Sequence, residues 1–265
     1  MMEDLVRRAL EEDIGSGDVT SEACIPASQR AAGRFIAREP LIISGLELLP
    51  LMYDSREILK RDGDHCLEGE VIATVAGPAR RLLALERTAL NFLQHLSGVA
   101  TMARQFADAA AGTTCRVLDT RKTTPSLREL EKRAAAAGGV TNHRMGLFDA
   151  ILIKNNHITA AGGVRNALER SREKRLPVEI EVRTREELRE ALQAGAEHLL
   201  LDNLTPAEAR DWIREIAGRA KVELSGGITL DTIRAYAETG ADFVSSGAIT
   251  HSARAMDISF RLELV

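Results

Sequence analysis

Polar and glycine-rich groups follow six short apolar segments in the second half of the chain. These groups are Asp119-Thr120-Arg121-Lys122, Lys154-Asn155-Asn156-His157 with the loop Asn142-His143-Arg144 before it, Glu181 with Arg183, Asp202-Asn203, Ser225-Gly226-Gly227 and Ser246-Gly247-Ala248. Apolar segments of this length are typical of buried strands, and β/α barrels carry their active sites at the carboxyl ends of the strands. The spacing therefore predicts one site that is assembled from six strand ends.

Cations dominate the first two segment ends, where Arg121, Lys122, Arg144 and Lys154 are found. Arginine binds carboxylates and phosphates through two parallel hydrogen bonds, and lysine adds a compact positive charge. An isolated Arg-Lys pair would usually form surface ion pairs. Cations that gather at neighbouring strand ends instead favour a binding site for a small polyanion.

The remaining segment ends predict the other parts of such a ligand. The carboxylates of Glu181 and Asp202 suit ribose hydroxyls or a bound Mg²⁺. The turns 225–227 and 246–248 suit a phosphate monoester, which β/α barrels often hold after their last strands at a helix N-terminus. We therefore expect a substrate that carries carboxylates, a sugar and phosphate.

Some of these residues also have a purely structural interpretation. Glu181 shares the segment 178–182 with Glu179, and we expect the alternation of side chains along the strand to select which of them points inward. His143 and His157, each taken singly, are typical of structural hydrogen-bonding residues rather than catalysts.

The elements that position these groups follow from apolar periodicity. The six apolar segments cover residues 115–119, 149–154, 178–182, 198–202, 221–225 and 241–247. The stretches between them have apolar residues at spacings of three and four, often with Thr or Ser at the start and Gly at the end, as helices do. Parallel strands joined by helices favour a β/α barrel over residues 101–250, with an open doubly wound sheet as the alternative.

The first hundred residues have a different pattern, and residues 1–100 are predicted to form a small α+β domain. A helix over residues 2–12 precedes segments that alternate as antiparallel strands do. A long helical stretch with one apolar stripe runs from Arg80 to about Ala111, and we expect Ser97-Gly98 to interrupt it. The tail, residues 251–265, has a strand pattern and is expected to return to this domain.

The composition excludes several classes of protein. The 265 residues carry 35 basic and 39 acidic side chains, a formal charge of −4, so no positive field attracts nucleic acid or an anionic membrane. Aromatic residues make up 3%, too few for base-stacking platforms. No apolar run approaches the roughly 18 residues of a membrane span. Three separated cysteines and an acidic N-terminal helix instead of a signal peptide lead us to expect a cytoplasmic enzyme.

The chain resembles the quinolinate phosphoribosyltransferases, the carboxylating nicotinate-nucleotide pyrophosphorylases of NAD synthesis. The likeness is carried by GSGDVTS, ERTALNFLQHLSGVAT, DTRKTTPSLRELEK, GGVTNHRMGLFDAILIKNNH, EIEV, LLLDN, ELSGGI and YAETGADFVSSGAITHS. The segments DTRKT and NHRMGL-x-DA-x-LIK are long and specific enough to make chance similarity implausible. The resemblance implies an α/β fold, an incomplete TIM-like β/α barrel with an N-terminal α/β sandwich domain, and a homodimer or higher oligomer with sites between subunits.

The resemblance also implies a reaction and its residues. Quinolinate and phosphoribosyl pyrophosphate would give nicotinate mononucleotide, pyrophosphate and CO₂. Arg121, His143, Arg144 and Lys154 would surround the pyridine dicarboxylate beside Thr120, and Arg87 would enter the neighbouring subunit's site. Lys122 would lie near the diphosphate, and Glu181 and Asp202 would hold the ribose hydroxyls and Mg²⁺. Ser225, Gly226 and Gly227 would cradle the 5′-phosphate together with Ser246, Gly247 and Ala248.

One departure and three alternatives accompany the resemblance. Asn155 stands where the family commonly has Asp, which removes one partner for Lys154. A related branch associated with molybdenum transport tends to lose the lysine and histidine of this segment, whereas Lys154 and His157 are both present here. A Schiff-base lyase that uses Lys154 as its nucleophile and a ligand-binding relative without activity are the other hypotheses.

Overall fold

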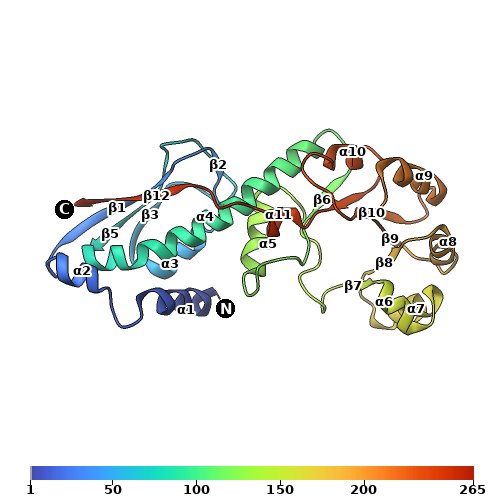
Figure 1. Cartoon of the computed structure of the whole chain (residues 1–265), viewed down its shortest axis with the longest axis horizontal. Helices are drawn as coiled ribbons and strands as arrows, with labels where there is room; N and C mark the ends of the chain where they lie inside the picture. Colours follow the sequence, from blue (N-terminus) through green and yellow to red (C-terminus); the bar gives the residue numbers. More distant parts are fainter. Residues whose placement is uncertain (1) are drawn as a thin grey trace. The chain divides into compact units, whose positions relative to one another are not determined.

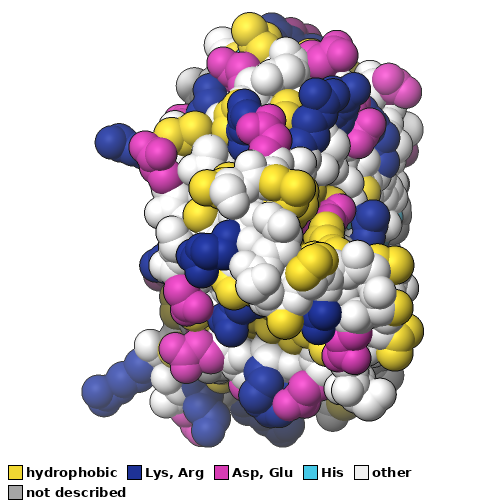
Figure 2. All heavy atoms as spheres, turned by 90° about the vertical axis from the view of Figure 1, so that its left-hand side faces the viewer, with side chains coloured by type: hydrophobic (Ala, Val, Ile, Leu, Met, Phe, Trp, Pro, Cys, Tyr) yellow, Lys and Arg dark blue, Asp and Glu magenta, His cyan; other side chains and the backbone are white. Residues whose placement is uncertain are grey.

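The computed structural model describes residues 2–265, which form two compact units (Figure 1). The first unit comprises residues 2–102, 137–139 and 253–265, and the second comprises residues 103–136 and 140–252. Among the described residues, no helix is both long and apolar enough to cross a membrane. Basic and acidic side chains are interspersed on the face that Figure 2 draws, so no single basic patch covers it.

The first unit is built on an antiparallel sheet with the strand order β12–β1–β5–β3. Its strands are β1 (Arg30–Ala37), β2 (Leu41–Ile42), β3 (Ser55–Ile58), β4 (His65–Cys66), β5 (Val71–Pro78) and β12 (Ile258–Leu264), and its short helices are α1 (Met2–Ile14), α2 (Val19–Cys24) and α3 (Leu49–Met52). The C-terminal strand β12 pairs with β1 from Ala31–Leu264 to Ala37–Ile258. The tail of the chain therefore forms an edge strand of the N-terminal sheet.

The long helix α4 (Ala79–Ala110) contributes residues to both units. The predicted apolar stripe is buried, because Leu82, Leu85, Leu90, Leu93 and Leu96 are each at most 6% exposed. The predicted break at Ser97-Gly98 is wrong: the helix continues through both residues. Ser97 is fully buried and its hydroxyl accepts the N–H of Ser44, while a side chain at position 98 would collide with the backbone carbonyl of Arg254. The small residues serve close packing here instead of ending the helix.

The second unit contains a six-stranded parallel sheet. Its strands are β6 (Arg116–Leu118), β7 (Ile151–Ile153), β8 (Val178–Val182), β9 (His198–Asp202), β10 (Lys221–Ser225) and β11 (Phe243–Ser245), and its helices are α5 (Arg128–Ala137), α6 (Asn155–Ala161), α7 (Val164–Ser171), α8 (Arg185–Gln193), α9 (Pro206–Ile216), α10 (Ile233–Ala237) and α11 (Ala248–His251). Each of the six predicted apolar segments contains one strand.

The order of the strands decides between the two predicted architectures. The sheet runs β7–β8–β9–β10–β11–β6, so each strand lies beside its neighbour in the chain and β6 joins beyond β11. A doubly wound sheet would instead reverse direction at an inner strand. At the edge formed by β6, the isolated bridge between Leu118 and Thr141 takes the place of a further full strand. The incomplete β/α barrel is therefore confirmed, and the doubly wound alternative is wrong.

Candidate active site

A cavity of about 880 Å³ opens at the carboxyl ends of the barrel strands. All of the predicted site residues except Arg87 line it: Thr120, Arg121, Lys122, His143, Arg144, Lys154, Glu181, Asp202, Ser225, Gly226, Gly227, Ser246, Gly247 and Ala248. Parallel strands direct their carboxyl ends to the same edge of the sheet, which is why residues far apart in sequence meet here.

The two arginine-bearing loops are fixed by the buried carboxylate of Asp119. Its oxygens accept the side-chain amide of Asn142 and the backbone N–H of His143, each at 2.7 Å, and a close contact from the Nζ of Lys132. Asp119 and Lys132 are both fully buried. Because Asp119 immediately precedes Thr120 and Arg121, one carboxylate holds the end of β6 and the loop before Arg144 in register.

Arg121 and Arg144 both line the cavity, and their positive charges interact. Burial and the positive charge of Arg121 lower the pKa of Arg144, so the two side chains are close enough to repel one another. The Nε of Arg121 is buried without a hydrogen-bond partner among the described residues. Arg144 donates to the carbonyl of Ala150 at 3.2 Å. Two neighbouring guanidinium groups, one with an unused buried donor, suit an anion that carries two carboxylates.

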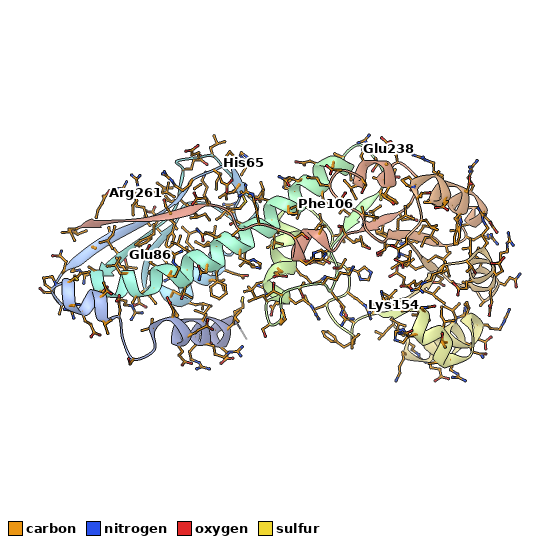
Figure 3. All side chains as sticks on the ribbon, in the orientation of Figure 1. His65, Glu86, Phe106, Lys154, Glu238 and Arg261 are labelled. Carbon is orange, nitrogen blue, oxygen red and sulfur yellow. The ribbon has the colours of Figure 1, made fainter. Side chains whose placement is uncertain are left out.

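Lys154 lies between β7 and α6 and is labelled in Figure 3. Its Nζ lies 3.4 Å from Oε2 of Glu181, and the guanidinium of Arg183 lies 3.0 Å from Oε1 of the same carboxylate. Glu181 therefore supplies the partner that Asn155 does not provide. His157 has a local structural role, because its Nδ1 accepts the backbone N–H of Lys154 at 2.9 Å at the start of α6.

Asp202 completes the acidic side of the cavity. Burial and the negative charge of Glu181 raise the pKa of Asp202, whereas the charges of Arg183 and Lys154 lower it to a smaller extent. The side-chain amide of Asn203 donates to Asp202 at 2.7 Å. Two carboxylates that repel one another at the end of neighbouring strands would be stabilised by a ligand that brings hydroxyl donors or a divalent cation.

The glycine turns after β10 and β11 also border the cavity, and the first lies beside Asp202, because Ser225 pairs with Asp202 across β9 and β10. Gly226 and Gly227 have positive φ values of 103° and 61°, which only glycine adopts readily. Ser246 is 3% exposed, and its N–H and hydroxyl are both engaged, with the carbonyls of Leu118 at 3.2 Å and Ile228 at 2.7 Å. Ser246 therefore shapes its turn, while the adjacent residues Gly247 and Ala248 line the cavity beside it.

The barrel interior contains acidic residues that the sequence analysis missed or misjudged. The expectation that strand alternation selects one of Glu179 and Glu181 is wrong, because residues two apart on a strand face the same side; both are buried, at 6% and 4% exposure. Glu223, in the middle of β10, is 1% exposed and also lines the cavity. The signal was present in the segment KVELS, where a carboxylate stands between two apolar residues of a strand that is buried on both faces.

Arg87 is the predicted site residue that the structure does not bring to the cavity. It is exposed on α4, next to Glu86, which Figure 3 labels. It belongs to the first unit, whereas the residues that line the cavity belong to the second.

Known proteins resemble this chain over almost its whole length. The family model of the N-terminal domain of quinolinate phosphoribosyl transferase matches residues 18–97, and that of the C-terminal domain matches residues 99–261. A probable nicotinate-nucleotide pyrophosphorylase [carboxylating] of Bacillus subtilis is 42% identical, over 96% of this chain and 90% of its own length. The chloroplastic enzyme of that name from Arabidopsis thaliana is 39% identical, over 98% of this chain and 82% of its own.

A solved structure gives the same result at the level of the fold. The nicotinate-nucleotide pyrophosphorylase of Ehrlichia chaffeensis superposes with a TM-score of 0.95 at 33% identity and covers 99% of both chains. The strand-end cavity, the two matching domain models and these full-length relatives lead to one conclusion: the chain belongs to the quinolinate phosphoribosyltransferase family.

Proposed function

We propose that this protein transfers the phosphoribosyl group of phosphoribosyl pyrophosphate to the ring nitrogen of quinolinate, with loss of the 2-carboxylate as CO₂. The products are nicotinate mononucleotide and pyrophosphate. The observation that carries the proposal is the division of one cavity into three parts: the cations Arg121, Arg144 and Lys154, the carboxylates Glu181 and Asp202, and the glycine turns after β10 and β11.

The cationic part suits the pyridine dicarboxylate. Arg121 and Arg144 repel each other in the absence of an anion, and a dianion placed between them would relieve that repulsion. The unused Nε–H of Arg121 would gain a carboxylate acceptor. These contacts orient the ring nitrogen toward the sugar, which lowers the entropic part of the barrier to bond formation.

The acidic part suits the reacting ribose. The ring nitrogen forms a bond to the anomeric carbon while the bond to pyrophosphate breaks, so positive charge develops on the ribosyl carbon. The buried carboxylate of Glu181 can stabilise this charge, and Lys122 can offset the charge that develops on the leaving pyrophosphate. The resulting pyridinium then withdraws electrons from the ring, the bond to the 2-carboxylate breaks, and the carbanion that remains takes up a proton.

The donor set fits a magnesium ion that enters with phosphoribosyl pyrophosphate. Burial and repulsion by Glu181 raise the pKa of Asp202, and a divalent cation would relieve the repulsion. Oxygen ligands are those that Mg²⁺ prefers. Glu181 and Asp202 would hold it, and the ion would neutralise charge on the diphosphate.

We infer a homodimer in which Arg87, exposed on α4, reaches the cavity of the neighbouring subunit. The formal charge of −4 and the three cysteines that form no disulfide, Cys24, Cys66 and Cys115, support a cytoplasmic location. Mixing Arg87→Ala protein with an Arg121→Ala protein tests the dimer: heterodimers should regain activity in one of their two sites, which neither homodimer has.

The direct test is formation of nicotinate mononucleotide from quinolinate, phosphoribosyl pyrophosphate and Mg²⁺, run beside nicotinate. Turnover of quinolinate with release of CO₂ supports the proposal, and turnover of nicotinate alone would overturn it. The lyase alternative predicts a covalent adduct on Lys154 after borohydride reduction with a carbonyl substrate. The Nζ of Lys154 forms an ion pair with Glu181, so a nucleophilic attack by this amine would first have to break that contact.

A further inference from the structure

A polar cluster inside the barrel borders the active-site cavity through His143 and Glu223. It consists of Glu179 on β8, Glu223 on β10, His198 at the start of β9 and the ring of His143. Glu179 and Glu223 are 6% and 1% exposed. Carboxylates this deeply buried are costly unless other groups satisfy them, so their arrangement requires a physical reason.

Both carboxylates converge on one nitrogen of His143. The Nε2 atom lies 3.2 Å from Oε2 of Glu179 and 3.3 Å from Oε2 of Glu223. One N–H can make only one well-aligned bond, and Oε2 of Glu223 is buried without a hydrogen-bond partner among the described residues. The Nε2 of His198 lies 3.5 Å from the other oxygen of Glu179.

The second nitrogen of His143 is directed at the backbone. Its Nδ1 accepts the N–H of Arg144 at 2.7 Å, which requires a lone pair at Nδ1 and therefore places the ring hydrogen on Nε2. Desolvation lowers the pKa of His143, but the hydrogen bonds and charges of Glu179 and Glu223 outweigh it and raise that pKa to about 10. A second ring proton on Nδ1 would break the bond from Arg144, so this contact favours the neutral ring. The backbone N–H of His143 itself donates to Asp119. The loop that carries Arg144 is thus held by two contacts: the imidazole of His143 accepts the N–H of Arg144, and Asp119 accepts the N–H of His143.

We propose that Glu179, Glu223 and His198 are positioning residues: they hold the Nε2–H tautomer of His143, whose Nδ1 then fixes the backbone of Arg144 so that its guanidinium lies beside Arg121. The cluster acts on the anionic substrate through His143 and Arg144. The predicted effect of the cluster on quinolinate binding rests on the proposed function. The predicted tautomer of His143 does not depend on that function.

The same atoms could instead bind a metal ion, and the experiment must distinguish metal binding from the hydrogen-bonded arrangement. The ligand atoms of His143, Glu179 and Glu223 all lie within 4.8 Å of one another, a spacing that a divalent transition metal also accepts. A metal would replace the hydrogen on Nε2. Nitrogen NMR of the imidazole ring distinguishes the two arrangements.

The first experiment is a long-range ¹H–¹⁵N spectrum of the full-length protein between about pH 6 and pH 8. The His143 signals are assigned by their absence from the His143→Asn spectrum. We expect a hydrogen on Nε2 and none on Nδ1, unchanged by a chelator. A hydrogen on Nδ1, or signals that change when a chelator removes a metal, would overturn the proposal. This measurement needs no turnover, so it remains decisive if the protein does not act on quinolinate.

The second experiment compares Glu179→Ala with Glu179→Gln in steady-state assays, with Glu223→Ala and Glu223→Gln as a second pair. Each alanine variant is expected to raise KM for quinolinate about tenfold and to leave KM for phosphoribosyl pyrophosphate within about twofold. Glu179→Gln keeps the oxygen acceptor for Nε2–H, and Glu223→Gln keeps a polar oxygen close to it, so both glutamine variants should recover most of the affinity. Glu215→Gln, on α9 and bound to Arg185 and Arg189, is the control. Equal rises in both KM values, or glutamine variants as impaired as alanine variants while the protein stays folded, would contradict a positioning role.

Discussion

Oε2 of Glu181 lies 3.4 Å from the Nζ of Lys154, and its other oxygen lies 3.0 Å from Arg183. One carboxylate that is 4% exposed therefore stands between two exposed cations at neighbouring strand ends. The two cations compensate the charge of this buried carboxylate. This arrangement keeps a negative charge where the proposed reaction develops positive charge on the sugar.

Replacing Glu181 by glutamine should reduce kcat more than substrate affinity. Glutamine keeps the size of the side chain but removes the charge that opposes the developing cation, and loss of one such electrostatic contact costs on the order of 10²- to 10³-fold in rate. Steady-state kinetics at saturating quinolinate and phosphoribosyl pyrophosphate measure the effect. Glu186→Gln, an exposed residue of α8, should behave as the parent protein. An unchanged kcat in Glu181→Gln would remove Glu181 from the proposed mechanism.

Arg144→Lys should chiefly weaken quinolinate binding. Lysine retains the positive charge but cannot form the two parallel bonds that a guanidinium makes with a carboxylate. We expect KM for quinolinate to rise about 10- to 100-fold, as for the loss of a charged hydrogen bond, with little change in KM for phosphoribosyl pyrophosphate. Arg170→Lys on α7 provides an exposed control. If the two KM values rose together in Arg144→Lys, Arg144 would not belong to the dicarboxylate part of the cavity.

The sequence allowed us to predict which residues meet in the site, because parallel strands place their carboxyl ends at the same rim of the barrel. Once the six apolar segments are assigned to strands, the residues at their carboxyl ends must meet at one rim. This is why Lys122, Lys154 and Asp202 line one cavity although up to 80 positions separate them. The start of α9 also carries a local signal, because Thr205 and Glu208 form the reciprocal hydrogen bonds of a capping box.

Features that depend on distant packing could not be predicted in the same way. Ser97-Gly98 has the local pattern of a helix break, but its environment is set by Ser44 and Arg254, which are remote in sequence. The family pattern places a partner of Lys154 beside it at position 155, whereas the structure supplies Glu181 from the next strand. Contacts across strands do not follow from the pattern of a single segment.

Lys132→Met should destabilise the protein strongly. The change removes the cation from the buried Asp119–Lys132 pair and leaves an uncompensated carboxylate, which typically costs about 3–5 kcal/mol. Chemical denaturation monitored by circular dichroism should show the loss in the free energy of unfolding. The adjacent Arg133 forms an exposed pair with Glu129 on the same helix, so Arg133→Met should cost at most about 1 kcal/mol. Equal stabilities of the two variants would show that the buried pair does not stabilise the fold.

Glu39 should make the stability of the first unit depend on pH. Hydrogen bonds from Arg254 and the N–H of Asp257 outweigh desolvation and lower the pKa of Glu39 to about 2. A carboxyl whose pKa is lower in the folded state stabilises the protein above its unfolded value of 4.5, and this contribution is lost as the pH falls toward 2. Glu39→Gln should therefore lower Tm at pH 7 but not near pH 2. Because Glu39 is a partly exposed group, the difference should be small. A constant difference in Tm across this range would contradict the linkage.

Gly226→Ala should damage both the fold and the phosphate side of the cavity, whereas Gly227→Ala should be milder. Gly226 has a φ of 103°, and a Cβ at this position would lie 2.7 Å from the backbone nitrogen of Asn203, which cannot move without disturbing the end of β9. Gly227 has a φ of 61° and no neighbouring atom within 4 Å of the added Cβ, so only conformational strain of about 1–2 kcal/mol opposes alanine there.

Thermal unfolding and steady-state kinetics of the two variants separate the effect of backbone strain, which both share, from the effect of the Cβ clash at Gly226. Gly226→Ala should lose about 1–3 kcal/mol more stability than Gly227→Ala, because the clash adds to the strain. If this turn cradles the 5′-phosphate, Gly226→Ala should raise KM for phosphoribosyl pyrophosphate and leave KM for quinolinate nearly unchanged. The reverse pattern of KM values would assign the turn after β10 to the dicarboxylate instead of the phosphate.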